Sequence, residues 1–181
     1  MPTFVALLRG INVGTAKRVP MARLRVLLTN LGYGQATTLL NSGNAVFCAP
    51  GGPSSKHAQA IAKALADEFN FEVPVVVKSR EELRTIVNDN SLIFAADDHP
   101  RLLAVFAQSP SALSCLTVAA ELVGPSEQFL LGKHAAYLHC PNGILQSKAG
   151  EALLGKVGKI VTTRNWATVL KLQKLTETIN A

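Results

Sequence analysis

TTLLNSGNAVFCA, residues 37–49, is typical of two β-strands joined by a tight turn. Thr37 to Asn41 and Ala45 to Ala49 contain the threonine, valine and phenylalanine side chains that strands favour, and Ser42-Gly43 between them is a turn pair. Glycine accepts the positive φ that such turns need. The stretch therefore predicts a β-hairpin, around which the first half of the chain is organised.

On each side of this hairpin the sequence predicts one helix and one strand. Before it come an apolar strand, residues 3–9, and a helix that begins at Pro20. After it come a helix over residues 53–70 and a β-branched strand over residues 73–78. The order β-α-β-β-α-β is that of a ferredoxin-like sheet.

The second half of the chain predicts a similar but degenerate unit. Strands are expected over residues 102–107, 128–131 and 135–140, and helices over residues 80–88, 111–120, 148–159 and 163–179. The last two of these helices close the chain. We therefore expect an α+β protein with two lobes, residues 1–90 and 91–181, and a boundary near Asp89 to His99.

Composition and cysteine usage exclude several classes of protein. With 48% hydrophobic and 17% charged residues among 181, the chain is neither disordered nor collagen-like. Its first apolar run ends at Arg9, too short for a membrane span and without the basic lead of a signal peptide, which predicts a cytoplasmic protein with no membrane partner. Cys48, Cys115 and Cys140 form no C-x-x-C pair, so we expect small buried hydrophobic side chains instead of disulfides or a zinc site.

The charges are unevenly distributed along the chain. The net charge is +6, yet residues 1–66 hold seven basic side chains and no acidic one. Residues 67–147 are net acidic, and residues 148–181 are net basic again. Both ends of the chain are therefore expected to favour anions, although a solvated basic face that only keeps the protein soluble explains the pattern equally well.

Two glycine- and asparagine-bearing loops form the first candidate site. In the predicted sheet they lie at one edge, where the first helix also begins, beside Lys17 and Arg18. Arg9 would pair with an anion, Asn12 and Asn44 would orient it, and backbone N–H groups would complete the site. The predicted ligand-binding residues are Arg9, Gly10, Asn12, Gly14, Ser42, Gly43 and Asn44. The alternative to an anion site is that the glycine and asparagine residues only form turns and that Arg9 is exposed to solvent.

The segment 162–166, Thr-Thr-Arg-Asn-Trp, supplies the second candidate site. It is expected to open the last helix with a threonine cap, which places Arg164 in the first turn. A cation there opposes the helix dipole, so Arg164 should have an acidic partner or a bound anion. We add Arg164 and Asn165 to the ligand-binding residues and expect them to face the same cleft as the first loops, with Trp166 in the core.

Three motifs in this order carry a family resemblance. Residues 6–14 (ALLRGINVG), 41–47 (NSGNAVF) and 163–166 (TRNW) resemble the bacterial family known as domain of unknown function 1697. The resemblance spans nearly the whole chain and implies a two-lobed α+β protein without an established reaction. The family pattern matches at Arg9, Asn12, Ser42, Asn44, Arg164 and Asn165, and it usually has Gln, Gly and a polar residue where Asn41, Thr15 and Ala167 stand.

The remaining motifs identify no reaction. Gly150 to Lys156 has the spacing of a P-loop, but Val157 replaces the serine or threonine that would bind magnesium. The four histidines are scattered and predicted to be solvated or hydrogen-bonded, and Asp97 and Asp98 are predicted to be solvated. No nucleophile, general base, metal or cofactor is assigned, and whether the protein is an enzyme stays open.

A nucleic acid and a second protein are the two alternative kinds of partner. RNA-recognition domains share the predicted element order, but they need aromatic side chains on the central strands, where only Phe4 and Phe47 stand. A nucleic acid would therefore be held weakly, through its phosphates alone. The third alternative is a protein–protein interaction module, and the oligomeric state is not predicted.

Overall fold

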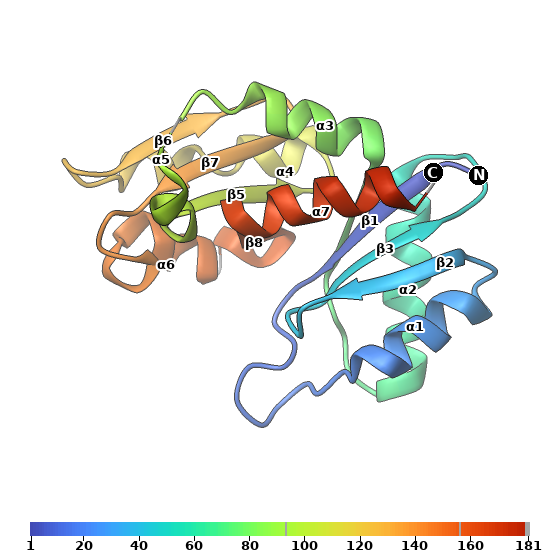
Figure 1. Ribbon diagram of the computed structural model, residues 1–181. Helices are drawn as coiled ribbons and strands as arrows, with labels where there is room; N and C mark the ends of the chain where they lie inside the picture. Colours follow the sequence, from blue (N-terminus) through green and yellow to red (C-terminus); the bar gives the residue numbers. More distant parts are fainter. Residues whose placement is uncertain (93, 156, 180–181) are drawn as a thin grey trace. The chain divides into compact units, whose positions relative to one another are not determined.

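The computed structural model describes residues 1–92, 94–155 and 157–179. Within these residues the protein is α+β, with two four-stranded antiparallel sheets and seven α-helices (Figure 1). The chain divides into two compact units. The first unit is Met1–Leu83 with Leu172–Ala181, and the second is Arg84–Lys171.

The first unit is built around the hairpin predicted at residues 37–49. Its elements are β1 (Thr3–Leu8), α1 (Met21–Asn30), β2 (Gly34–Leu39), β3 (Asn44–Cys48), α2 (Ser54–Phe69) and β4 (Val75–Ser79). The strands lie in the order β2-β3-β1-β4, and each neighbouring pair is antiparallel. Because β1 and β2 both pair with β3, they run parallel, and their carboxyl ends lie at the same edge of the sheet.

Helices α1 and α2 cover one face of this sheet (Figure 1). Helix α1 buries Leu24, Leu27 and Leu28 at helical spacing, and the face of β1 beneath it alternates Phe4, Ala6 and Leu8. Each large apolar side chain that becomes fully buried contributes about 1.5–3 kcal/mol to folding. The core therefore fixes the face of the sheet on which the helices lie.

Strand β2 is an edge strand with a break in its pairing. Its register against β3 shifts between Gly34 and Thr37. Gln35 within this shift has a φ of +53°, and its Oε1 accepts a hydrogen bond from Cys48 Sγ at 3.4 Å. The shift is the irregularity of a β-bulge, which bends and twists the edge.

The second unit repeats the arrangement of strands. Its strands are β5 (Leu102–Ala107), β6 (Gln128–Leu131), β7 (Ala135–His139) and β8 (Val161–Asn165), in the order β6-β7-β5-β8. Its α-helices are α4 (Pro110–Ser114), α5 (Thr117–Glu121) and α6 (Lys148–Leu154), and its 3-10 helices are η1 (Ala96–Arg101), η2 (Ile144–Gln146) and η3 (Val157–Ile160). Helices α3 (Arg80–Asp89) and α7 (Trp166–Thr178) each begin in one unit and end in the other. In sheet position, β5 corresponds to β1 and β8 to β4.

The predicted helix over residues 163–179 is wrong at its start. Val161, Thr162 and Thr163 lie on β8, which pairs with β5, because three consecutive β-branched side chains suit a strand. Helix α7 begins only at Trp166, and Asn165 caps it, since Asn165 Oδ1 accepts a hydrogen bond from Thr168 N at 2.9 Å.

Two other predicted helices are shorter than expected. The helix predicted over residues 111–120 is divided into α4 and α5 by a turn at Cys115 and Leu116. The helix predicted over residues 148–159 ends at Leu154, and Lys156, the last residue of the P-loop-like motif, lies outside the described residues. Cys48 and Cys140 are buried, but Cys115 is exposed, which corrects the expectation for that side chain. No helix in the described ranges has the length and apolarity to cross a membrane.

Candidate functional site

The two predicted loops of the first unit are in direct contact. We call residues 9–19 the Arg9 loop and residues 40–43 the Ser42 turn. Leu8 N, at the end of β1, donates a hydrogen bond to Gly43 O at 2.8 Å, and Asn12 Nδ2 donates to Asn41 O at 2.7 Å. The loops thus form one continuous edge, as the parallel directions of β1 and β2 require.

Gly43 permits this close approach. A Cβ at this position would lie 2.7 Å from Leu8 Cβ and 2.8 Å from Ile11 Cδ1, and the φ of Gly43 is +84°. A side chain here would meet both steric overlap and an unfavourable backbone conformation. The turn therefore packs against the Arg9 loop only with glycine at residue 43.

Asn12 joins the two loops and Asn44 braces the hairpin from within, while their predicted role of orienting a ligand stays a prediction. Asn12 Nδ2 also donates to Val19 O at 2.9 Å, and its Oδ1 accepts from Val19 N at 2.9 Å. Asn44 is fully buried, and its Nδ2 donates to Leu39 O and Ser42 Oγ, both at 2.9 Å. Both N–H groups of each amide are therefore used by acceptors within the protein.

The backbone of the Arg9 loop turns left-handed at four positions. Gly10, Asn12, Gly14 and Lys17 have φ between +50° and +67°. Gly10 and Gly14 are exposed, and their N–H groups donate to no acceptor within the described part of the chain. Alternation of left- and right-handed residues is the conformation that directs backbone N–H groups toward an anion.

The side chains around this backbone are cationic. Arg9 is half-buried, and burial lowers the pKa of its guanidinium, which nevertheless stays charged at neutral pH. Lys17 Nζ donates a hydrogen bond to Glu72 O at 3.1 Å, and Arg18 is exposed. Arg9, Lys17 and Arg18 therefore place three cationic side chains in the Arg9 loop itself, which holds no acidic residue.

Arg164 and Asn165 lie in the second unit, at the end of β8. Arg164 is 8% exposed, and its Nη1 donates to Thr162 Oγ1 at 2.7 Å and Thr163 O at 2.8 Å. Burial lowers the pKa of Arg164 to about 10. The predicted conflict with a helix dipole is wrong because Arg164 is in a strand. That Arg164 and Asn165 face the ligand of the first loops stays a prediction.

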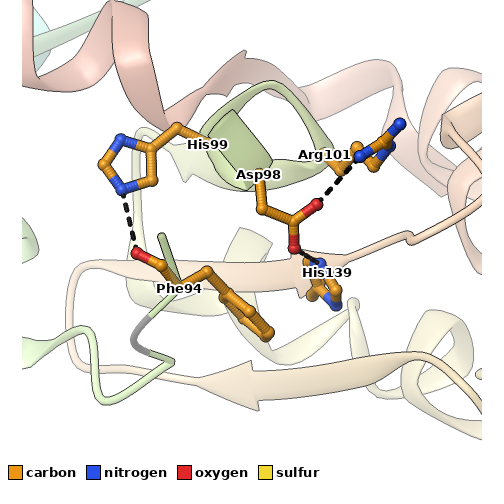
Figure 2. Close-up of polar contacts among 5 residues, drawn as sticks. All are labelled: Phe94, Asp98, His99, Arg101 and His139. Carbon is orange, nitrogen blue, oxygen red and sulfur yellow. Dashed lines mark hydrogen bonds and ion pairs between the residues drawn. The ribbon is translucent and has the colours of Figure 1, made fainter. Parts of the chain in front are cut away.

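A polar cluster that the sequence does not reveal lies in the second unit (Figure 2). His139 Nε2 on β7 is 2.6 Å from Asp98 Oδ2 on η1, and Arg101 Nη1 donates to Asp98 Oδ1 at 3.1 Å. The hydrogen bonds from Arg101 and then His139 lower the pKa of the Asp98 carboxyl. Asp98 is therefore an anchor between η1 and β7, which corrects the expectation of a solvated acid.

The ring of His139 is buried against Phe94 in addition to its hydrogen bond with Asp98. The ring of Phe94 stacks on it with the centroids 3.8 Å apart, and His139 Nδ1 is buried without a hydrogen-bond partner among the described residues. In the described ranges no three metal-ligating side chains gather anywhere. The contact between His139 and Asp98 fastens η1 to β7.

The aromatic side chains on the central strands of the first unit are part of its core. Phe4 and Phe47 are at most 2% exposed and stack on each other with centroids 5.9 Å apart. Tyr33 and His57 pack against them, and Tyr33 Oη is 2.9 Å from His57 Nδ1. These rings are therefore not accessible to nucleic-acid bases.

Comparison with known proteins adds a family and a fold. The model of a family described as "Protein of unknown function (DUF1697)" matches residues 1–137. A conserved bacterial protein, SP0830 from Streptococcus pneumoniae, has a solved structure similar to this one, with a TM-score of 0.80 and 23% sequence identity over 97% of this chain and 98% of that chain. No curated protein matches the chain. At this identity the structural likeness shows the fold alone.

Proposed function

The chain belongs to the DUF1697 family of proteins of unknown function, and for this member we propose that the Arg9 loop and the Ser42 turn bind an anionic or phosphorylated small ligand. The binding edge would belong to a ferredoxin-like sheet in a cytoplasmic protein. The proposal is one of binding, because no nucleophile or general base is assigned at these loops.

The observation that carries the proposal is the joining of the two loops beside Arg9. Arg9 is the cation nearest the junction in sequence, and the exposed Gly10 and Gly14 lie one and five residues after it in the same loop. The guanidinium would pair with the anion, and the N–H groups and the Ser42 hydroxyl would complete its hydrogen bonds. Asn12, Gly43 and Asn44 would keep this arrangement in place before the ligand arrives.

Thermal unfolding in the presence of inorganic phosphate, nucleotides and sugar phosphates tests the proposal. A ligand at 100 times its Kd adds about 2.7 kcal/mol to the free energy of unfolding. We expect at least one of these anions to stabilise the protein and the effect to disappear in Arg9→Ala. Arg25→Ala, which removes an exposed arginine of α1, is the matched control. The proposal fails if no anion stabilises the protein, or if Arg9→Ala responds as the native chain does.

Phosphate-backbone binding of a nucleic acid is the second candidate function, and the seven basic side chains without an acid in residues 1–66 favour it. The logarithm of the affinity would then fall by about 0.7–0.9 per phosphate contact for each tenfold rise in salt. Oligonucleotide titrations at several salt concentrations measure this slope. Tight oligonucleotide binding near physiological salt, with no response to small anions, would establish this function instead. If neither ligand class binds, a protein partner is the remaining alternative.

A further inference from the structure

Two exposed apolar side chains flank the junction of the Arg9 loop and the Ser42 turn. Val13 is 75% exposed and Leu40 is 54% exposed. Val13 follows Asn12 and Leu40 precedes Asn41, the two residues that the 2.7 Å hydrogen bond joins. Val13 and Leu40 are therefore the sequence neighbours of the two residues that join the loops, at the edge of the sheet where β1 ends at Leu8.

Leu40 is unfavourable for folding in two respects. Its φ is +59°, a left-handed conformation in which a bulky side chain is rare and strained. Its apolar surface also stays largely in water. Asparagine or glycine would adopt this backbone conformation more easily and expose less apolar surface. A leucine that costs free energy both in its backbone conformation and in its exposed apolar surface points to a contact made with a ligand.

We propose that the ligand of these loops is a soluble anion that carries an apolar group, of the class of alkyl phosphates. Arg9 pairs with the charged end, and Val13 and Leu40 contact the apolar end. This inference rests on the proposed function, since it names the substrate class of the same site.

The charge of the surroundings agrees with an amphiphilic anion. Lys17 and Arg18 stand in the same loop as Val13, and no acidic side chain occurs before Asp67 in the sequence. A neutral apolar ligand would gain nothing from these cations, and an anion without an apolar part would leave Val13 and Leu40 in water. One molecule with both parts satisfies both features.

Isothermal titration with a graded series tests the inference: inorganic phosphate, then methyl, propyl, butyl and hexyl phosphate. Burial of one CH₂ group improves affinity by about fourfold at most. We expect Kd to fall about two- to fourfold for each added CH₂ in the native chain. In Val13→Ser with Leu40→Asn, the dependence on chain length should vanish while Kd for inorganic phosphate is unchanged. Val26→Ser is the matched control, because Val26 is 55% exposed on α1, away from both loops.

The outcomes separate this inference from the proposed function. If inorganic phosphate binds through Arg9 but Kd is independent of chain length, the apolar part of the inference is wrong and the anion site stands. If no member of the series binds, the inference is wrong, and the thermal-unfolding screen with nucleotides and sugar phosphates decides the proposed function separately. If the dependence on chain length persists in the double variant or disappears in Val26→Ser, the alkyl chain binds elsewhere and the assignment of Val13 and Leu40 is overturned.

Two further measurements complete the test. Thermal unfolding of Leu40→Asn without ligand should show an unchanged or higher Tm, whereas a markedly lower Tm would show that Leu40 serves the fold and would overturn the inference. Sedimentation with vesicles of phosphatidylcholine and phosphatidic acid distinguishes a soluble ligand from a lipid headgroup. We expect no sedimentation, and sedimentation that depends on Leu40 would overturn the assignment to a soluble ligand.

Discussion

Asn12 Nδ2 lies 2.7 Å from the carbonyl oxygen of Asn41, and this hydrogen bond joins two loops that are 29 residues apart in the sequence. The same side chain also bonds both polar backbone groups of Val19, at the far end of its own loop. One amide therefore fixes the internal shape of the Arg9 loop and its position against the Ser42 turn.

Replacement of Asn12 by glycine isolates the hydrogen bonds of this amide. Glycine tolerates the φ of +55°, so the expected loss in stability of roughly 1–3 kcal/mol comes from the backbone groups that lose their partners. Urea denaturation measures the loss. Thr15→Ala, an exposed position in the same loop, should change stability by less than about 0.5 kcal/mol. Equal effects of the two substitutions would contradict the role of the amide.

Gly43→Ala should destabilise the first unit by more than the cost of placing alanine at a positive φ. The added Cβ would overlap Leu8 and Ile11, and overpacking of this kind costs about 1–3 kcal/mol. Gly32→Ala is the matched control, because Gly32 has a φ of +80° but a Cβ there meets no atom within 4 Å. The difference in unfolding free energy between the two variants measures the overlap. A difference near zero would show that the turn moves away at no cost.

His57 should make the stability of the first unit pH-dependent. Burial lowers the pKa of this imidazole below its ordinary value near 6.5 and outweighs a hydrogen bond to the backbone of Pro50, which raises it. The unfolded chain therefore binds a proton more readily, so the contribution of His57 is complete above about pH 6.5 and is lost as the pH falls toward the folded pKa. Urea denaturation between pH 5 and 8 should show a smaller slope in His57→Phe than in the native chain. An unchanged slope would contradict this assignment.

Glu82 should be more important for stability than an exposed glutamate. Its Oε2 accepts from Ser54 Oγ at 2.6 Å and Ser79 N at 2.7 Å, and its Oε1 is 3.7 Å from the buried Nζ of Lys78. Burial raises the pKa of the Glu82 carboxyl, but the hydrogen bonds from Ser54 and Ser79 and the charge of Lys78 outweigh burial, so the pKa is lowered. The contribution of Glu82 to the free energy of unfolding is therefore lost as the pH falls through the lowered pKa. Glu82→Gln should cost roughly 1–3 kcal/mol at pH 7.

The control for Glu82 is Glu72→Gln, an exposed position in the same unit. Urea denaturation at pH 7 should show a change of less than about 0.5 kcal/mol for this variant. If both variants lose the same free energy, the carboxylate of Glu82 does not stabilise the start of α3.

Asp98→Asn should loosen η1 from β7. The substitution removes the charge that holds His139 and Arg101 (Figure 2), so amide hydrogen exchange should accelerate over residues 96–101. Asp97→Asn changes the neighbouring carboxylate, which makes neither contact, and should leave exchange unchanged. Equal exchange in the two variants would show that the cluster does not fasten η1.

The first unit could be predicted from sequence because its signals are local. The turn at Ser42 and Gly43, the apolar spacing of α1 and the β-branched residues of β4 each specify one element, and topology then places the two loops at one edge. The roles of Asn12 and Asn44 could not be predicted in this way. An amide beside glycine suits a ligand contact and a loop brace equally well, and only the positions of the acceptors distinguish them.

The second unit could be predicted less well because its elements are short and its contacts are distant in sequence. Thr162 and Thr163 suit a strand and a helix cap alike, and pairing with β5 decides in favour of the strand. Asp98 and His139 are 41 residues apart, so no spacing rule brings them together. Leu40 has no sequence signal at all, since its significance lies in a φ angle and an exposed fraction.

The break in register between Gly34 and Thr37 has a consequence for how the protein behaves at high concentration. A regular edge strand presents a row of backbone donors and acceptors on which a second molecule can add its own strand, the first step of aggregation. The bulge in β2 interrupts that row. In the second unit the corresponding edge strand, β6, is only four residues long and offers little length for such pairing. The two sheets therefore protect equivalent edges from self-association by different means, irregular pairing in one and short length in the other.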